Sequence, residues 1–311
     1  MNYGSLPAFT LRRLRDGLVV LFLVTLIIFV LGHVVGDPAE VMAPVDASEQ
    51  EIARIRQQLG LDRPFGEQFV SYFGSLVQGD FGQSLWQDRP ALTVVNEALP
   101  ATVLLTVVGL ILAGLGGSFL GMLAGARPES RLDQGANLLS IVALSVPNFW
   151  LGLLLIVIFA VELRLVPTSG FTGWQSLILP AGTLGMIHGA RIFQLVRSAT
   201  FEEITKPYAL VARSKGLPER FILWKHILRN TAVIMATTVG WEYVRMMGGA
   251  AFAIEVVFAW PGIGQLMIQA ASRQDFPVLQ AAVIVAGAFV IVTNAAVDLF
   301  YRYLDTRIHP G

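Results

Sequence analysis

The chain is organised around long apolar stretches that are separated by polar segments. A helix that crosses a hydrocarbon core of ~30 Å needs about 20 mostly apolar residues. Six stretches reach this length: 17–35, 101–126, 136–161, 177–199, 231–257 and 278–301. The fourth and fifth are interrupted by His188, Arg191, Glu242 and Arg245. We therefore expect an all-α membrane protein with six transmembrane helices.

Basic residues indicate the orientation of these helices. Arg12, Arg13 and Arg15 precede the first apolar stretch, as in a signal peptide, but the stretch is too long and no small-x-small cleavage site follows it. A retained signal anchor is the better interpretation. Lys and Arg are enriched in cytoplasmic loops, and most of the 22 basic residues lie on the side of the two termini. We expect both termini in the cytoplasm, with residues 1–16 as the cytoplasmic N-terminus and 36–100 as a large external loop.

Composition agrees with a membrane protein. Hydrophobic residues make up 54% of the chain and charged residues 14%, whereas a soluble domain has about 25% charged residues. The mean hydropathy is +0.63. A formal net charge of zero offers no electrostatic footprint for nucleic acid. Because the chain has no cysteine, disulfides and thiolate chemistry are excluded.

The external loop is expected to hold two amphipathic helices. Ser48 and Glu51 form a capping box at the start of the first helix, and Gly60 favours its end. The second helix has an aromatic face, as in helices that lie on a membrane surface, built from Phe65, Phe69, Tyr72, Phe73 and Leu76. A packed cap with no role in substrate handling is the simpler interpretation of both helices.

The cytoplasmic segment 201–230 predicts two short helices that meet at a sharp corner. Gly216 is the residue type that most easily adopts a positive φ, and Pro218 suits the first turn of a second helix. Small Ala212 beside basic Arg213 suits docking into a groove of another protein. An interfacial loop under the helices would explain the charges but not the compact corner.

This corner carries a resemblance to a known family. Residues 212–217, followed by 226–230, resemble the "EAA" coupling loop of permeases of binding-protein-dependent ABC importers. They are most similar to the first permease subunit, of dipeptide-permease-B-like type, of the dipeptide/oligopeptide/nickel family. Further stretches match the family in order and spacing: 36–38, 59–64, 79–84, 99–102, 145–152, 179–181, 255–264 and 275–278. Leu210 and Val211 depart from the loop's usual glutamate and alanine, and Pro207 replaces an acidic residue.

The resemblance implies a type I importer fold, with residues 101–311 as the core permease domain. It implies a heterodimer with a second homologous permease subunit, two ATP-binding subunits and an extracytoplasmic solute-binding protein. The location implied is the bacterial cytoplasmic (inner) membrane, and the solutes implied are di- and oligopeptides. The residues expected to contact the ATPase are Tyr208, Ala209, Ala212, Arg213, Ser214, Lys215, Gly216 and Leu217.

The energy source is expected to lie outside this chain. No Walker-type phosphate loop occurs in the sequence, so ATP and Mg²⁺ are expected on the partner ATPase subunits. We expect no cofactor, no metal site and no catalytic residue in this chain. Movement of the ATPases would act on the corner and rock the transmembrane helices between outward- and inward-facing states.

Two pairs of ionisable residues are candidates for the solute path. Glu242 and Arg245 are three residues apart, and so are His188 and Arg191, so each pair shares a helix face. Ionisable groups inside a membrane face a cavity or a partner. Glu242 and Arg245 either line the path or form a structural ion pair. His188 and Arg191 either line the path or pack against the second permease subunit.

A turn after the fifth stretch is a candidate external gate. Glu255 precedes Trp260, Pro261, Gly262 and Gly264. The carboxylate either gates the path or contacts the binding protein, or it caps the turn, which is the simpler interpretation.

Other functions remain open. Importers of nickel or a metallophore, an opine, glutathione or another modified peptide share the same architecture. A bare metal is disfavoured, because the chain has no cysteine and His188 is the one histidine well inside an apolar stretch. An intramembrane enzyme would need paired catalytic groups, yet Asp298 is alone in the last stretch. A sensor or purely structural protein would leave the corner unexplained.

Overall fold

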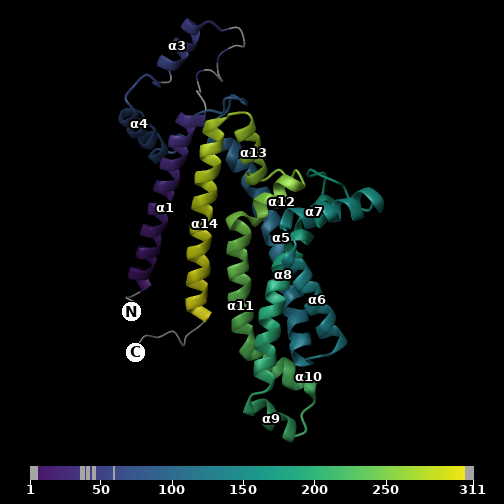
Figure 1. Cartoon of the computed structure of the whole chain (residues 1–311). Helices are drawn as coiled ribbons and strands as arrows, with labels where there is room; N and C mark the ends of the chain where they lie inside the picture. Colours follow the sequence, from purple (N-terminus) through teal and green to yellow (C-terminus); the bar gives the residue numbers. More distant parts are fainter. Residues whose placement is uncertain (1–5, 36–38, 40–42, 44–46, 59, 305–311) are drawn as a thin grey trace. The chain divides into compact units, whose positions relative to one another are not determined.

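The computed structural model describes residues 6–35, 39, 43, 47–58 and 60–304 of the 311-residue chain. Its regular elements are helices (Figure 1), apart from one isolated bridge between Gln83 and Pro90. The helices are α1 (Leu6–Val35), α3 (Glu49–Gln58), α4 (Phe65–Val77), α5 (Ala91–Ala126), α6 (Arg131–Ser145), α7 (Asn148–Leu155), η1 (Ile156–Glu162), α8 (Gln175–Ile204), α9 (Pro207–Ser214), α10 (Glu219–Phe221), η2 (Ile222–Ile227), α11 (Leu228–Arg245), η3 (Met246–Ala250), α12 (Ala251–Val257), α13 (Ile263–Ser272) and α14 (Phe276–Leu304). The resembling stretch 36–38 lies outside the described residues.

The helices form two compact units. The first comprises residues 1–100 and 262–295, and the second comprises 101–261 and 296–311. Because the boundaries fall within α5 and α14, each of these helices contributes to both units. The candidate coupling corner and the candidate solute-path residues all belong to the second unit.

In the first unit, both helices predicted within residues 36–100 are confirmed. The Ser48 backbone N–H donates to the Glu51 carboxylate at 2.8 Å, and Gly60 follows the helix with a φ of 68°. The aromatic face of α4 packs on α1: the ring of Phe29 lies 5.3 Å from Phe69 and 5.2 Å from Tyr72. These rings therefore cover a neighbouring helix, which a face exposed only at a membrane surface would not do.

In the second unit, α8 packs against α6, α7 and α11. Its approach to α5 is close because α5 presents a glycine every fourth residue. A Cβ built on Gly117, Gly121 or Gly125 would lie under 3.0 Å from a backbone oxygen of α8. Small residues let helix backbones approach in this way in membranes. The central helix α8 is thus held on several sides.

Two predicted straight helices are broken. Stretch 136–161 is divided into α6 and α7–η1, which meet at 110°. Pro147 causes the bend, because it lacks a backbone N–H and keeps the preceding Val146 extended at φ −98° and ψ 134°. Stretch 231–257 breaks within η3, where Gly249 has a φ of 144°. The prediction of one continuous helix was therefore wrong for these two stretches, 136–161 and 231–257.

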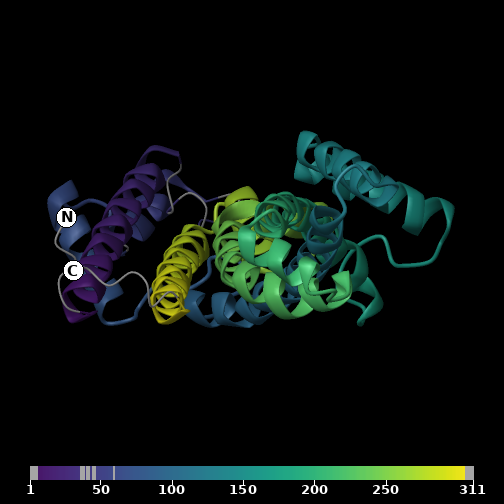
Figure 2. The same cartoon turned by 90° about the horizontal axis from the view of Figure 1, so that it is seen from below.

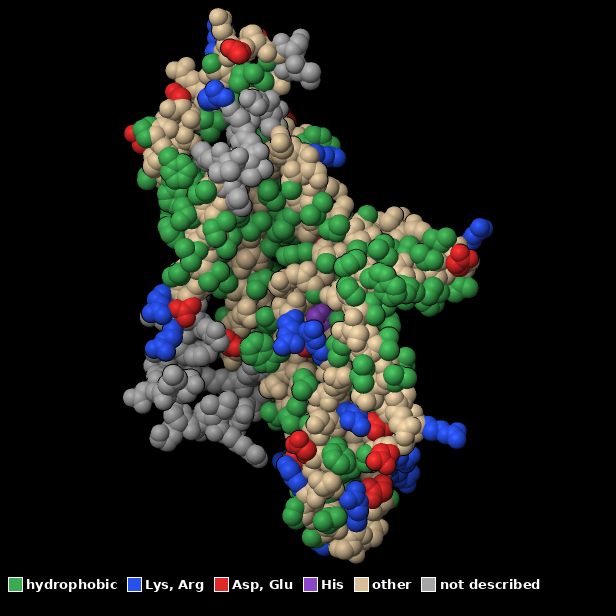
Figure 3. Space-filling view, in the orientation of Figure 1, with side chains coloured by type: hydrophobic (Ala, Val, Ile, Leu, Met, Phe, Trp, Pro, Cys, Tyr) green, Lys and Arg blue, Asp and Glu red, His purple; other side chains and the backbone are tan. Residues whose placement is uncertain are grey.

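Among the described residues, two helices are long and apolar enough to cross a membrane by length and composition. These are Ala91–Ala126 and Phe276–Phe300, and the bent pair α6 with α7–η1 would make a third. A count of six spans therefore stays a prediction. On the face drawn in Figure 3, hydrophobic side chains cover much of α7, whereas charged side chains gather over α9 and α10.

Candidate coupling and solute-path sites

The corner predicted from Gly216 is present as a compact local structure. Helix α9 ends at Ser214, Gly216 has a φ of 73°, and Pro218 is the residue before α10 rather than inside its first turn. Arg213 holds the corner together. Its guanidinium donates to the Glu219 carboxylate at 2.7 Å and to the Ile204 carbonyl at 3.0 Å.

One side of α9 is buried and the other is exposed. Ala209 and Ala212 pack into a small apolar cluster with residues of α8 and η2. Leu210 and Val211 are 55% and 52% exposed, next to exposed Ser214 and Lys215. Ala212 was predicted to lie on the docking face, but it is buried, and its small side chain lets α9 approach the neighbouring helices. Figure 2 looks from below onto this end of the chain.

Glu203, near the end of α8, connects three helices. Lys206 forms an ion pair with its carboxylate, the Tyr208 hydroxyl donates to it at 2.5 Å, and Asn230 of α11 donates at 3.1 Å. Burial by itself would raise the pKa of Glu203, but these three donors outweigh burial and lower it below 4.5. The corner is therefore tied to both α8 and α11. Glu203 and Asn230 were not predicted as site residues; the i,i+3 spacing of Glu203 and Lys206 was the available signal.

The two candidate pairs of the solute path form one cluster. His188 Nδ1 lies 2.6 Å from Glu242 Oε2, although these residues are 54 positions apart in the chain. Arg245 Nη1 donates to Glu242 Oε1 at 2.9 Å, and Arg191 Nη1 lies 3.8 Å from Oε2. We call His188, Arg191, Glu242 and Arg245 the ionic cluster. Helix α8 supplies its first two residues and α11 its last two.

Burial within the ionic cluster is uneven. The side chains of His188 and Glu242 are 3% and 2% exposed, whereas those of Arg191 and Arg245 are 43% and 53% exposed. The second ring nitrogen of His188, Nε2, is buried and has no hydrogen-bond partner in the described part of the chain. The carboxylate is thus at the centre, and the guanidinium groups face outward.

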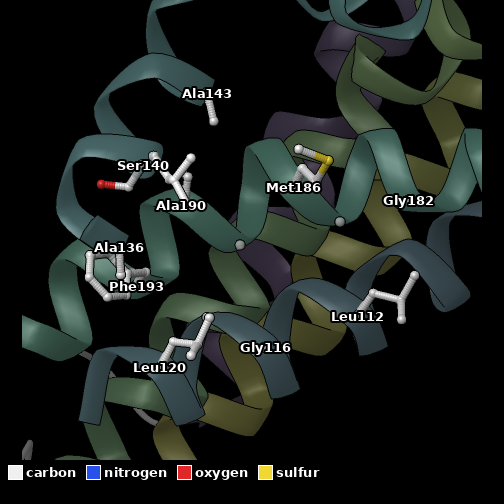
Figure 4. A pocket seen from close by; sticks show the side chains of 14 residues that line it. Leu112, Gly116, Leu120, Ala136, Ser140, Ala143, Gly182, Met186, Ala190 and Phe193 are labelled. Atoms are coloured by element: carbon white, nitrogen blue, oxygen red, sulfur yellow. The ribbon is translucent and has the colours of Figure 1, made fainter. Parts of the chain in front are cut away.

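The other face of α8 has a different character. Together with α5 and α6 it lines an apolar groove of about 400 Å³ (Figure 4). Gly182, Gly185 and Gly189 contribute from α8, with Leu112 of α5 and Ala136 of α6. His188 and Arg191 fall on the opposite side of α8 at 100° per residue. One helix thus separates a small-residue groove from a charged surface.

The candidate external gate is a tightly bonded turn. Trp260 is fully buried; its indole N–H donates to the Ala101 carbonyl at 2.9 Å, and its backbone N–H donates to the Glu255 carbonyl at 2.8 Å. Gly262 and Gly264 lie in the other unit, at the start of α13. Glu255 is itself fully buried. This geometry favours the structural interpretation of the turn.

Metal ligands do not gather in the described residues. No group of three or more His, Cys, Asp or Glu side chains is placed there to hold a metal ion.

The fold of this chain recurs in a solved ABC transporter. It matches a structure described as "Inward facing conformations of the MetNI methionine ABC transporter: CY5 SeMet soak crystal form" with a TM-score of 0.56. The match covers 68% of this chain and 96% of that chain at 18% sequence identity. A second crystal form of the same transporter gives a TM-score of 0.55 over the same shares of the two chains. The two chains therefore share a fold.

The chain belongs to the family of binding-protein-dependent transport system inner membrane components. Residues 117–310 match that family, and residues 6–106 match its N-terminal domain. The chain is 34% identical over 301 residues to the "Glutathione transport system permease protein GsiC" of Escherichia coli strain K12, covering 96% of this chain and 98% of that protein. Identity to the protein of the same name from Salmonella typhi is 35% over the same shares.

Family membership fixes the general role. This protein is a permease subunit of a binding-protein-dependent ABC importer of the inner membrane, and it is related to the oligopeptide and nickel permeases. Such a subunit works with ATPase and solute-binding partners. The resemblance found in the sequence is confirmed.

Proposed function

We propose that this chain forms one half of a heterodimeric translocation path for di- and oligopeptides. It crosses the membrane six times with both termini in the cytoplasm, pairs with a second homologous permease, and rests on two ATPase subunits. A solute-binding protein delivers the peptide from outside. The chain itself makes and breaks no covalent bond, and ATP and Mg²⁺ bind to the ATPase subunits.

The observation that carries this proposal is that the corner and the ionic cluster share the same two helices. Glu203 ties α9 to the end of α8 and, through Asn230, to the start of α11. His188 and Arg191 lie further along α8, and Glu242 and Arg245 lie further along α11. A push on α9 therefore acts on both helices that carry the cluster. Rigid helices of this kind are suitable carriers of a rocking motion between two states.

The contact with the ATPase is proposed to be made by the exposed side of α9. Leu210 and Val211 present apolar surface beside Lys215. Covering an exposed apolar side chain at the cytoplasmic end of a membrane protein with a partner subunit lowers the free energy, because apolar surface is removed from water. Three of the expected coupling residues support α9 from its buried side: Ala209 and Ala212 by packing, and Arg213 by its ion pair with Glu219.

Likeness to glutathione permeases favours a short peptide or a modified peptide as solute. Two relatives named for glutathione transport match 96% of this chain. Glutathione or another modified peptide is therefore the second candidate beside ordinary di- and oligopeptides. Nickel, metallophores and opines are less well supported, because none of the similar proteins named above is described as carrying them.

Site-specific crosslinking tests the contact with the ATPase. Since the chain has no cysteine, a single Leu210→Cys substitution gives a unique thiol on α9. In the assembled complex, a short bifunctional reagent should join this thiol to an ATPase subunit, and the yield should change when ATP binds. Glu67→Cys, on exposed α4 of the external loop, is the matched control and should give no ATPase adduct. Adducts from Glu67→Cys but not from Leu210→Cys would contradict the proposed docking surface and orientation.

A further inference from the structure

The ionic cluster has more positive than negative charge. Two guanidinium groups, Arg191 and Arg245, share the single carboxylate of Glu242. Within the described residues, Glu242 is the one acidic side chain that contacts either guanidinium group. One positive charge is therefore left over when His188 is neutral, and more when it is protonated.

Such a surplus is costly in a membrane. Ionisable groups there are paired or face a cavity, and a charged group without a partner costs more than a neutral one. The two guanidinium groups are about half exposed, whereas the carboxylate between them is almost fully buried. The donors of Arg191 and Arg245 that do not contact Glu242 are thus available to a further anion.

The buried nitrogen of His188 is a second sign of a missing ligand. Nε2 is enclosed, lacks a hydrogen-bond partner among the residues that the structure describes, and belongs to a side chain that is 3% exposed. Buried polar atoms in native proteins have partners in the large majority of cases. Because Nδ1 donates to the Glu242 carboxylate, Nε2 of the neutral ring is an acceptor, so a donor group of the solute or a solute-bound water would supply the partner.

Guanidinium groups bind carboxylates well because their donors match the two carboxylate oxygens. We infer that Arg191 and Arg245 bind a carboxylate of the transported peptide, so that the permease favours peptides of net negative charge over zwitterionic peptides. A zwitterionic peptide has no net charge and therefore does not neutralise the surplus positive charge of the ionic cluster. An acidic peptide with one additional carboxylate neutralises it. This inference rests on the proposed function, because it assigns the cluster to the solute path.

Two sources could supply the carboxylate: the peptide or the second permease subunit. The test compares the tripeptides Ala-Glu-Ala and Ala-Gln-Ala, which differ by one negative charge, in proteoliposomes that contain the full complex and one binding protein. Arg191→Gln and Arg245→Gln should each lower ATP-driven uptake of the acidic peptide about tenfold or more, and that of the neutral peptide by less than about threefold. Arg131→Gln removes an exposed charge at the start of α6 and should leave both rates unchanged.

A second measurement makes the result independent of uptake. Ala-Glu-Ala should raise the Tm of the purified wild-type complex more than Ala-Gln-Ala does, since a ligand stabilises the state that it binds. Arg245→Gln should remove this difference. Equal loss of uptake for both peptides, or failure of the Arg245→Gln subunits to copurify, would assign the carboxylate to the second permease subunit and overturn the inference.

The two measurements also separate this inference from the proposed function. If the wild-type complex imports neither peptide but keeps the charge-dependent Tm difference, the carboxylate site is supported and peptide import is contradicted. If the wild-type complex imports both peptides, and neither Arg191→Gln nor Arg245→Gln changes the ratio of the two uptake rates, peptide import is supported and the carboxylate site is contradicted. Absence of both import and the Tm difference overturns both.

Discussion

Two buried glutamates lie on the same pair of helices and have opposite surroundings. Glu203, at the α9 end of α8, is matched by one ammonium group, Lys206, and by the neutral donors of Tyr208 and Asn230. Glu242, further along α11, is matched by two guanidinium groups and a histidine. The first network has no net charge, whereas the second has a positive surplus.

This difference in net charge indicates different roles: the Glu203 network connects helices, whereas the Glu242 network is suited to bind a solute. A balanced and fully hydrogen-bonded network has nothing left to bind, so the Glu203 network stabilises one arrangement of α8, α9 and α11. A surplus charge is stable only when a counter-ion arrives or when solvent reaches it. The Glu242 network is therefore suited to a charged solute that comes and goes.

The largest expected effect comes from removing the central carboxylate of the ionic cluster. Glu242→Gln removes the carboxylate that both guanidinium groups contact and should lower stability by about 2–4 kcal/mol, less than for a fully buried pair, because Arg191 and Arg245 are about half exposed. Peptide uptake should be abolished. Thermal unfolding of the purified complex measures the loss, and Glu242→Asp, which keeps the charge, is the control. A Tm change no larger than that of Glu203→Gln would contradict the contrast between the two glutamates.

A smaller effect is expected from Glu203→Gln. The glutamine keeps an oxygen that accepts from Tyr208 or Asn230 but loses the ion pair with Lys206. The expected cost is about 1–3 kcal/mol. Because the joint between α9 and α11 weakens, more ATP should be hydrolysed for each peptide imported. Proteoliposomes in which both rates are recorded give this ratio; an unchanged ratio would show that the Glu203 network does not transmit the motion.

The same glutamate predicts a pH dependence. Its pKa in the folded protein lies below the usual value of 4.5. The ionised carboxylate therefore stabilises the folded protein fully above pH 4.5, and this contribution is lost as the pH falls through the lower, folded pKa. Wild-type complex should lose stability below pH 4.5 more steeply than Glu203→Gln. Parallel Tm profiles of the two proteins in this range would exclude Glu203 as the cause.

The smallest effect is expected at the exposed ion pair of the corner. Glu219 is 66% exposed, and exposed pairs contribute about 0–1 kcal/mol. Glu219→Gln should change the Tm of the complex less than either buried substitution does, and it should leave uptake close to wild type. Arg213 keeps its bond to the Ile204 carbonyl in this variant. A loss of uptake as large as that of Glu242→Gln would give the Arg213–Glu219 pair a larger role than its exposure indicates.

Sequence patterns determined the local features. The Ser48–Glu51 capping box, the aromatic face of α4 and the positive φ of Gly216 were all predicted and are all present. Each of these features depends on residues within a few positions of one another. Capping, helix periodicity and glycine conformation act over that distance, so one sequence is enough to predict them. The order of short motifs was likewise enough to identify the permease family.

The tertiary structure alone decided which distant groups meet. From the sequence, Glu242 with Arg245 and His188 with Arg191 were predicted as separate i,i+3 pairs, because helix spacing relates only residues on the same helix. Packing of α8 against α11 brings the two pairs together around one carboxylate, and among the described residues it leaves one guanidinium charge without a counter-charge. The bend at Pro147 was also missed: the apolar run was assigned to one helix by its length, although a proline within it is a local signal for a break.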